Sequence, residues 1–187
     1  MKEIKKANTY NIALMGLLFA LAIVLSAVEY MIPPIPLMPP GVKLGLANIV
    51  TMYCLFFLGK KQTFLIVFLK SAFVFLIRGA TAFMISLSGG ILSALIMILL
   101  MVLAGERVSY LIISICGAIS HNIGQLIIAS FVLGTNIFVF YLPLLIISGV
   151  LMGYITGTIL KIVLPAFDRV KNSQSFGVKI KHRSDNK

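Results

Sequence analysis

The sequence has no tryptophan and only five acidic residues, and charged residues of all kinds make up 11% of its 187 positions. Hydrophobic residues make up 60% of the chain, which is more than a soluble domain can cover with polar surface. The scarcity of charge therefore excludes a soluble globular domain and predicts an integral membrane protein. The net charge of +11 does not indicate a nucleic-acid partner, because most basic residues lie in short segments between apolar runs and in the C-terminal tail.

Cysteine is also scarce. Cys54 and Cys116 lie inside apolar runs without a paired or Cys/His spacing, so we expect them to pack and predict neither a disulfide framework nor a metal site. The sequence has no GxxxxGK[ST] loop for ATP either. Energy for any transport must therefore come from another subunit or an ion gradient, and we expect no cofactor.

Proline is nearly confined to one place, since five of the seven prolines fall between Pro33 and Pro40. Their fixed φ and missing N–H groups exclude helix and central strand there. Lys43 follows between two glycines, and Asn48 lies one turn into the next apolar run. We interpret this stretch as a stiff loop that leads into a helix, either as a connector or as a lid over a ligand.

Apolar windows of sufficient length to cross hydrocarbon occur six times, although the second and third are short and must thin the bilayer or be shielded by neighbours. We predict an all-α bundle of about six transmembrane helices in one domain, residues 1–165, followed by a basic, disordered tail over residues 166–187. The predicted spans are approximately 10–32, 44–58, 63–77, 80–103, 108–133 and 138–164.

An even number of spans places both termini on one side of the membrane. If the termini are cytoplasmic, the outer connections carry only Lys43 and Arg78, and the other basic connections and tails face the cytoplasm. This positive-inside bias predicts a multi-pass protein of the cell membrane with both termini in the cytoplasm.

Polar side chains inside the predicted spans are costly, so each is a candidate for function. Lys70 lies midway along the third span. It is a candidate for ligand contact, and its structural alternatives, which do not exclude that contact, are a buried pair with Glu29 or bonds to helix carbonyls. His121 and Gln125 are four residues apart and share a helix face. With the predicted topology the polar set lies from the midplane outward, which suggests a cavity open to the outside for an anionic ligand. The candidate substrate-binding residues are Glu29, Lys43, Asn48, Lys70, Arg78, Ser86, Ser88, His121, Asn122 and Gln125.

Small residues recur at helical spacing in the first span. Gly16, Ala20, Ala22 and Ser26 form overlapping small-xxx-small patterns, which favour a close helix contact within this chain or with another protein.

Several motifs resemble a known membrane family. GVKLGLANIV after the proline-rich loop, the basic residue in the third span, SLSGG, GAISHNIGQL and FYLPLLIISGVLMG resemble the heptaprenyl diphosphate synthase component I family, also called Gx transporters. That family is similar to the substrate-binding S components of energy-coupling factor (ECF) transporters. The resemblance implies a six-helix bundle with an outward ligand pocket, and a first helix whose small residues (Gly16, Ala20, Ala22 and Ser26 here) contact a transmembrane coupling subunit.

The positions of the acidic residues show whether this chain could itself be a prenyl diphosphate synthase. Elongation of prenyl diphosphates needs clustered carboxylates that hold magnesium ions. No two of the five acids are neighbours, so we predict that this chain does not catalyse that reaction.

Three functions remain open. The first is a substrate-binding subunit of an ECF-type uptake transporter, with a coupling subunit and ATPases as partners. The second is a non-catalytic membrane accessory subunit of a separate prenyl diphosphate synthase. The third, a self-sufficient secondary carrier, is weakened by the scarcity of intramembrane acids for ion coupling.

Overall fold

The computed structural model describes residues 2–31, 45–104, 108–133 and 140–162, and the regular secondary structure of these residues is helical. Within these ranges, four helices contain segments long and apolar enough to cross a membrane, namely Ile12–Glu29, Lys60–Leu103, Tyr110–Val132 and Phe140–Ile162. The prediction of an all-α, membrane-type protein is therefore confirmed. The proline-rich loop with Lys43, and the basic tail, lie outside the described residues.

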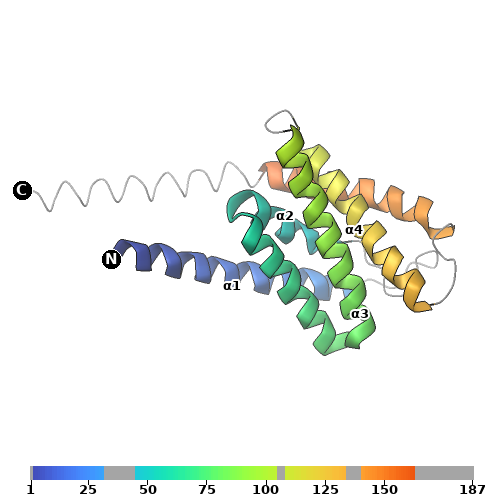
Figure 1. The fold of residues 1–187 in the computed structure, drawn as a ribbon, viewed down its shortest axis with the longest axis horizontal. Helices are drawn as coiled ribbons and strands as arrows, with labels where there is room; N and C mark the ends of the chain where they lie inside the picture. Colours follow the sequence, from blue (N-terminus) through green and yellow to red (C-terminus); the bar gives the residue numbers. More distant parts are fainter. Residues whose placement is uncertain (1, 32–44, 105–107, 134–139, 163–187) are drawn as a thin grey trace, which may run out of the picture.

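Helix α1 covers Lys2–Met31 and ends two residues before Pro33 in the sequence, as expected for a chain that approaches consecutive prolines. Leu18, Ala22 and Ser26 follow one another at intervals of one turn and are buried. Most of the remaining α1 surface whose side chains are described is exposed and apolar. Thus α1 contacts the rest of the bundle, mainly α3 and α2, along one narrow stripe (Figure 1).

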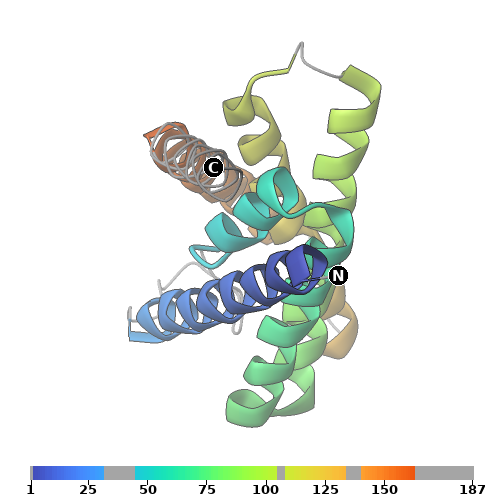
Figure 2. The ribbon, with the colours of Figure 1, turned by 90° about the vertical axis from the view of Figure 1, so that its left-hand side faces the viewer.

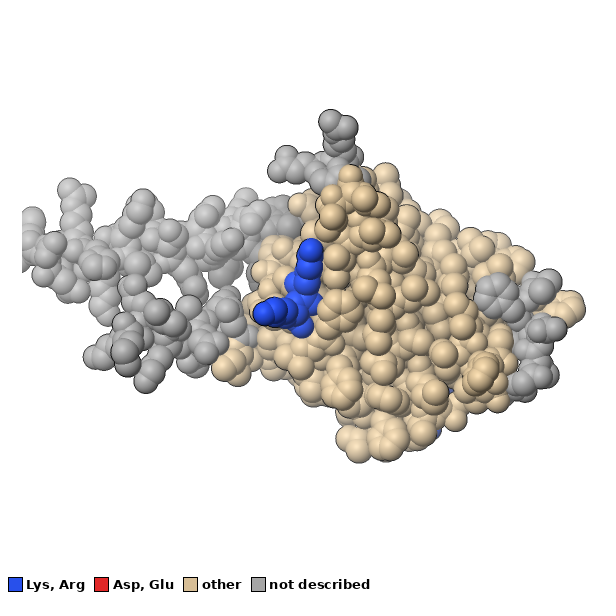
Figure 3. All heavy atoms as spheres, in the orientation of Figure 1, with Lys and Arg blue, Asp and Glu red and all other residues tan. Residues whose placement is uncertain are grey.

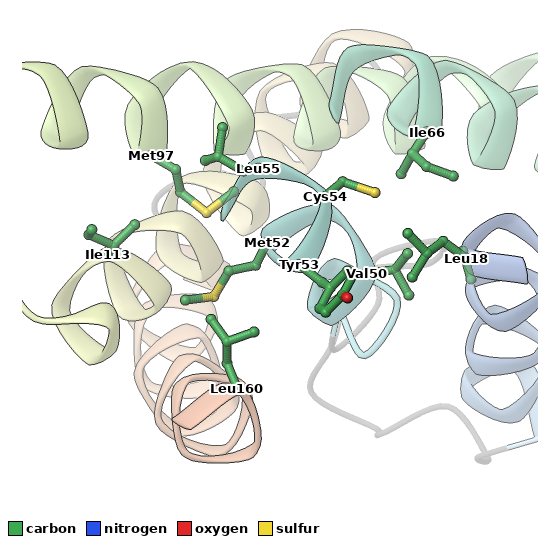
Figure 4. Packing of buried hydrophobic residues seen from close by; sticks show 11 residues of the cluster. Leu18, Val50, Met52, Tyr53, Cys54, Leu55, Ile66, Met97, Ile113 and Leu160 are labelled. Atoms are coloured by element: carbon green, nitrogen blue, oxygen red, sulfur yellow. The ribbon is translucent and has the colours of Figure 1, made fainter. Parts of the chain in front are cut away.

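Helix α2, Asn48–Phe57, is short and lies at the centre of the core. Figure 4 shows its side chains between Leu18 of α1, Ile66 and Met97 of α3, and residues of the later helices. Seven of its residues are buried: Asn48, Val50, Thr51, Met52, Tyr53, Cys54 and Leu55. Because α2 is covered on most sides, its few polar groups must find partners inside the protein.

Helix α3, Lys60–Ala104, folds back on itself at Gly79, where φ is 81° and ψ is −174°. This backbone conformation is accessible essentially only to glycine. The two legs run side by side in opposite directions (Figures 1 and 2), with Phe75 against Phe83 at a ring-centroid separation of 5.9 Å. The turn falls between the predicted third and fourth spans. The count of six membrane crossings stays a prediction.

Helix α4, Tyr110–Leu133, packs against the second leg of α3 and against the 140–162 helix. The latter contact is made by three glycines one turn apart. A Cβ placed on Gly149, Gly153 or Gly157 would lie 3.0 Å from Ile119 Cα, 2.5 Å from Ile115 Cα and 3.1 Å from Leu111 Cα, respectively. The glycines therefore allow the two helix backbones to approach closely, as in membrane helix pairs.

The described surface is largely apolar. Large hydrophobic side chains are exposed on every long helix, as a lipid-facing surface requires. The face drawn in Figure 3 is almost free of charge apart from a basic cluster over the start of α3, where Lys60 and Lys61 are exposed. Charge at the helix end with apolar sides beyond it is the arrangement expected at a membrane boundary.

A buried polar network as the candidate binding site

Lys70, on the first leg of α3, is the only described lysine whose side chain is buried, with 5% of its surface exposed. Its Nζ donates a hydrogen bond to Thr51 Oγ1 of α2 at 3.1 Å. Of the described acids, Glu29 is the one whose charge acts on Lys70. The bundle therefore holds a cation away from water, between α2 and α3, with an acid nearby.

Glu29, near the end of α1, binds the segment that leads into α2. Its Oε1 accepts hydrogen bonds from the backbone N–H groups of Gly45 and Leu46, the latter at 2.7 Å. Gly45 has φ of 91°, and its carbonyl accepts the Asn48 N–H at 2.8 Å, so a tight turn leads into α2. The side chain of α1 thus fixes the start of the central helix.

Asn48, the first residue of α2, is 5% exposed. Its Nδ2 donates to Ser93 Oγ on the second leg of α3 at 3.2 Å. Asn48 and Thr51 lie three residues apart on α2, so the same short helix presents one polar group to each leg of α3.

His121 and Gln125 share a face of α4, as their spacing predicts, and their Nε2 atoms lie 3.1 Å apart. They pack over Gly89 of α3, where an added Cβ would lie 2.7 Å from Gln125 Cγ and 3.1 Å from His121 Cε1. On the other side, a Cβ on Gly45 would lie 3.6 Å from His121 Cδ2. His121 therefore borders the turn that Glu29 holds.

The two predicted serines of α3 have structural partners. Ser86 Oγ accepts a hydrogen bond from Ser71 Oγ of the opposite leg at 3.3 Å. Ser88 Oγ donates to the Gly124 carbonyl of α4 at 2.9 Å and lies 3.0 Å from the Ile85 carbonyl. These contacts join the second leg of α3 to its neighbours.

Asn122 points toward the 140–162 helix, away from His121. Its Nδ2 donates to the Leu145 carbonyl at 2.8 Å and to Ser148 Oγ at 3.1 Å. Asn122 is 1% exposed, and its Oδ1 has no hydrogen-bond partner. The structure therefore separates Asn122 from the Glu29 and His121 side of the network.

Not all predicted residues come together. Arg78 is exposed at the turn of α3. On α1, Ala22 and Ser26 are buried within this chain, whereas Gly16 and Ala20 are exposed. The predicted small-residue pattern is therefore divided between two faces, and only Gly16 and Ala20 remain available to another protein.

The hydrogen-bond partners of the predicted residues were not among the residues predicted from the sequence. Thr51 and Ser93 bind Lys70 and Asn48, and the N–H groups of Gly45 and Leu46 bind Glu29. Thr51 carried a usable signal, because it lies three residues after Asn48 on the same helix face. The backbone donors carried none, since every residue except proline has an N–H group.

The network offers a buried cation, two convergent N–H donors, hydroxyl groups and an imidazole. These are groups that bind an anion, and among the residues described no three His, Cys, Asp or Glu side chains lie close enough to hold a metal ion. Whether an open cavity reaches this network from the outside stays a prediction.

Comparison with known proteins gives one family. No curated protein and no solved structure matches the chain. The family model described as heptaprenyl diphosphate synthase component I matches residues 18–163, which include all of the described network. The chain therefore belongs to the heptaprenyl diphosphate synthase component I family.

Proposed function

We propose that this chain is a non-catalytic membrane subunit that works with a separate prenyl diphosphate synthase and binds the diphosphate group of an isoprenoid. The family name supports the synthase partner. The single structural observation that carries the ligand assignment is Lys70, a buried cation bonded to Thr51 of α2.

The apolar surroundings suit the other half of such a ligand. Isoprenoid chains partition into the bilayer, so a subunit embedded in lipid can take the hydrocarbon part directly from the membrane. The diphosphate needs positive charge and hydrogen-bond donors, which the network supplies. Catalysis is left to the partner, because the five acids of this chain are dispersed along the sequence.

Purification from native membranes tests this function. The full chain, tagged and extracted in mild detergent, is expected to retain a prenyl diphosphate synthase that mass spectrometry identifies. Adding the chain in nanodiscs to that synthase should increase the yield of long-chain product. The Lys70→Gln variant should still co-purify with the synthase but should not increase the yield of long-chain product. Ser71→Ala serves as the matched control, because it removes a buried polar group on the same helix leg one residue away.

A second candidate is the substrate-binding subunit of an ECF-type uptake transporter. The observation that favours it is the exposed pair Gly16 and Ala20: in the described part of the chain, no other helix comes within 4 Å of a Cβ added to Gly16. A small-residue face of this kind suits a partner helix. Retention of a membrane coupling subunit and ATPases in place of a synthase would reject the first proposal and support this one.

A further inference from the structure

The start of α2 has the geometry of an anion site. The N–H groups of the consecutive residues Gly45 and Leu46 converge on one oxygen, Glu29 Oε1. Successive N–H groups that point to one place form a concavity with positive partial charge, and the N-terminus of the helix that follows adds to it. In this structure a carboxylate of the chain itself fills that place.

A second group that favours an anion lies close by. The Lys70 ammonium interacts electrostatically with Glu29, and its one hydrogen bond given by the structure goes to the uncharged Thr51 hydroxyl. A buried ammonium has three donors and requires negative charge nearby. Apolar surroundings screen charges less than water does, so Lys70 adds to the attraction of this region for an anion.

The two charged residues differ in their freedom to move. Lys70 is buried inside the bundle, whereas Glu29 is partly exposed at the end of α1. The Glu29 side chain also has rotatable bonds that allow its carboxylate to turn toward solvent. The acid can therefore leave the turn while the cation and the N–H groups stay in place.

We propose that the Glu29 carboxylate is an internal occupant of an anion site formed by the Gly45 and Leu46 N–H groups and the Lys70 ammonium, and that the diphosphate of the ligand binds by displacing it. This inference rests on the proposed function. The incoming group carries more negative charge than the carboxylate it replaces, so its attraction to Lys70 is larger. Ligand binding would release the contact by which α1 holds the start of α2.

Chemical rescue tests the displacement. Glu29→Ala vacates the two N–H groups, and the variant is expected to unfold at a lower temperature than the wild type. In detergent free of anionic lipid and of carboxylate buffer, 10 mM inorganic pyrophosphate should raise the unfolding temperature of Glu29→Ala by about 3 °C or more above any shift of the wild type. The double variant Glu29→Ala/Lys70→Gln should lose this extra shift.

Three results would overturn the inference. The first is that pyrophosphate raises the unfolding temperature of Glu29→Ala and of the wild type equally. The second is that the double variant shows the full rise in unfolding temperature. The third is that 10 mM acetate rescues Glu29→Ala and pyrophosphate does not. The last result would reject the diphosphate while leaving a co-purifying synthase, and with it the partner assignment, intact.

Glu29→Gln keeps the experiment decisive if Glu29→Ala does not fold. The amide retains an acceptor oxygen for the N–H groups and removes only the charge. Calorimetric titration should then show about five-fold tighter pyrophosphate binding than the wild type, the effect of losing one competing charged hydrogen bond. Equal or weaker binding by a folded Glu29→Gln would overturn the proposal.

Discussion

Single polar residues in an apolar bundle are informative because each must find a partner or serve a ligand. Lys70 donates a hydrogen bond to the Thr51 hydroxyl and interacts electrostatically with Glu29. Asn122, in contrast, uses its amide group to join two helices. The two residues belong to the same predicted set, yet their contacts imply different roles, and substitution can separate them.

Lys70→Met should abolish pyrophosphate binding and leave the protein as stable as the wild type. Replacing the buried charge by an apolar side chain of similar size removes a desolvation penalty along with one hydrogen bond and the attraction to Glu29. Because Glu29 is partly exposed and keeps its two N–H donors, the free energy of unfolding should change by no more than about 1 kcal/mol. Calorimetry measures the binding, and unfolding in detergent measures the stability. A large loss of stability would mean that Lys70 is structural.

Asn122→Ala should show the opposite pattern. It removes two hydrogen bonds between helices, each contributing about 0.6 kcal/mol on average in a membrane protein, so we expect a loss of about 1–2 kcal/mol with pyrophosphate binding retained. Ser148→Ala removes only one partner of Asn122 and should cost about half as much. A larger effect of the serine substitution would contradict this account. Unfolding in mixed detergent micelles provides the measurement.

At the scale of elements, α2 is the centre of the molecule and close helix contacts surround it. Its polar residues bind both legs of α3, and its apolar residues pack against all the neighbouring helices (Figure 4). The three glycines of the 140–162 helix hold that helix against α4. Their spacing of one turn suits a membrane helix pair, and it was not singled out from the sequence.

Gly153→Ala should separate this helix pair. The new methyl group would lie 2.5 Å from the Ile115 Cα, and a backbone atom cannot move aside as a flexible side chain can. We expect a loss of about 1–3 kcal/mol in the free energy of unfolding, as for other overpacked contacts. Gly16→Ala is the matched control, because it adds the same methyl group to a membrane helix with nothing within 4 Å. It should be neutral or slightly stabilising. Equal effects would contradict the close contact.

At the scale of the whole molecule, the distribution of basic residues defines a testable orientation. Lys60 and Lys61 lie at one end of the first leg of α3, and Arg78 lies at the other, beside the Gly79 turn. The positive-inside rule predicts that the lysines face the cytoplasm and that the turn lies outside.

Cysteine labelling checks this orientation. In a variant whose two native cysteines are replaced by alanine, Arg78→Cys should react with a membrane-impermeant maleimide on intact cells. Lys61→Cys should react only after the membrane is opened. Both positions are exposed, so access depends on the side of the membrane. Reaction of Lys61→Cys on intact cells would show that this end of α3 faces outward and would contradict the predicted orientation.

Composition and pattern alone determined that this protein is an all-helical membrane protein, because lipid tolerates few exposed polar groups and long apolar runs in helices satisfy that demand. They also located the costly polar residues of the interior. Only the tertiary structure decided how those residues pair: Glu29 with two backbone N–H groups, Lys70 with Thr51, and Asn122 with the 140–162 helix. It also divided the small residues of α1 between two faces. The free-energy cost of burying a side chain depends on its residue type, which the sequence gives. Its hydrogen-bond partner depends on which helix faces meet, which only the tertiary structure gives. Backbone N–H donors cannot be recognised in the sequence, because every residue except proline has one.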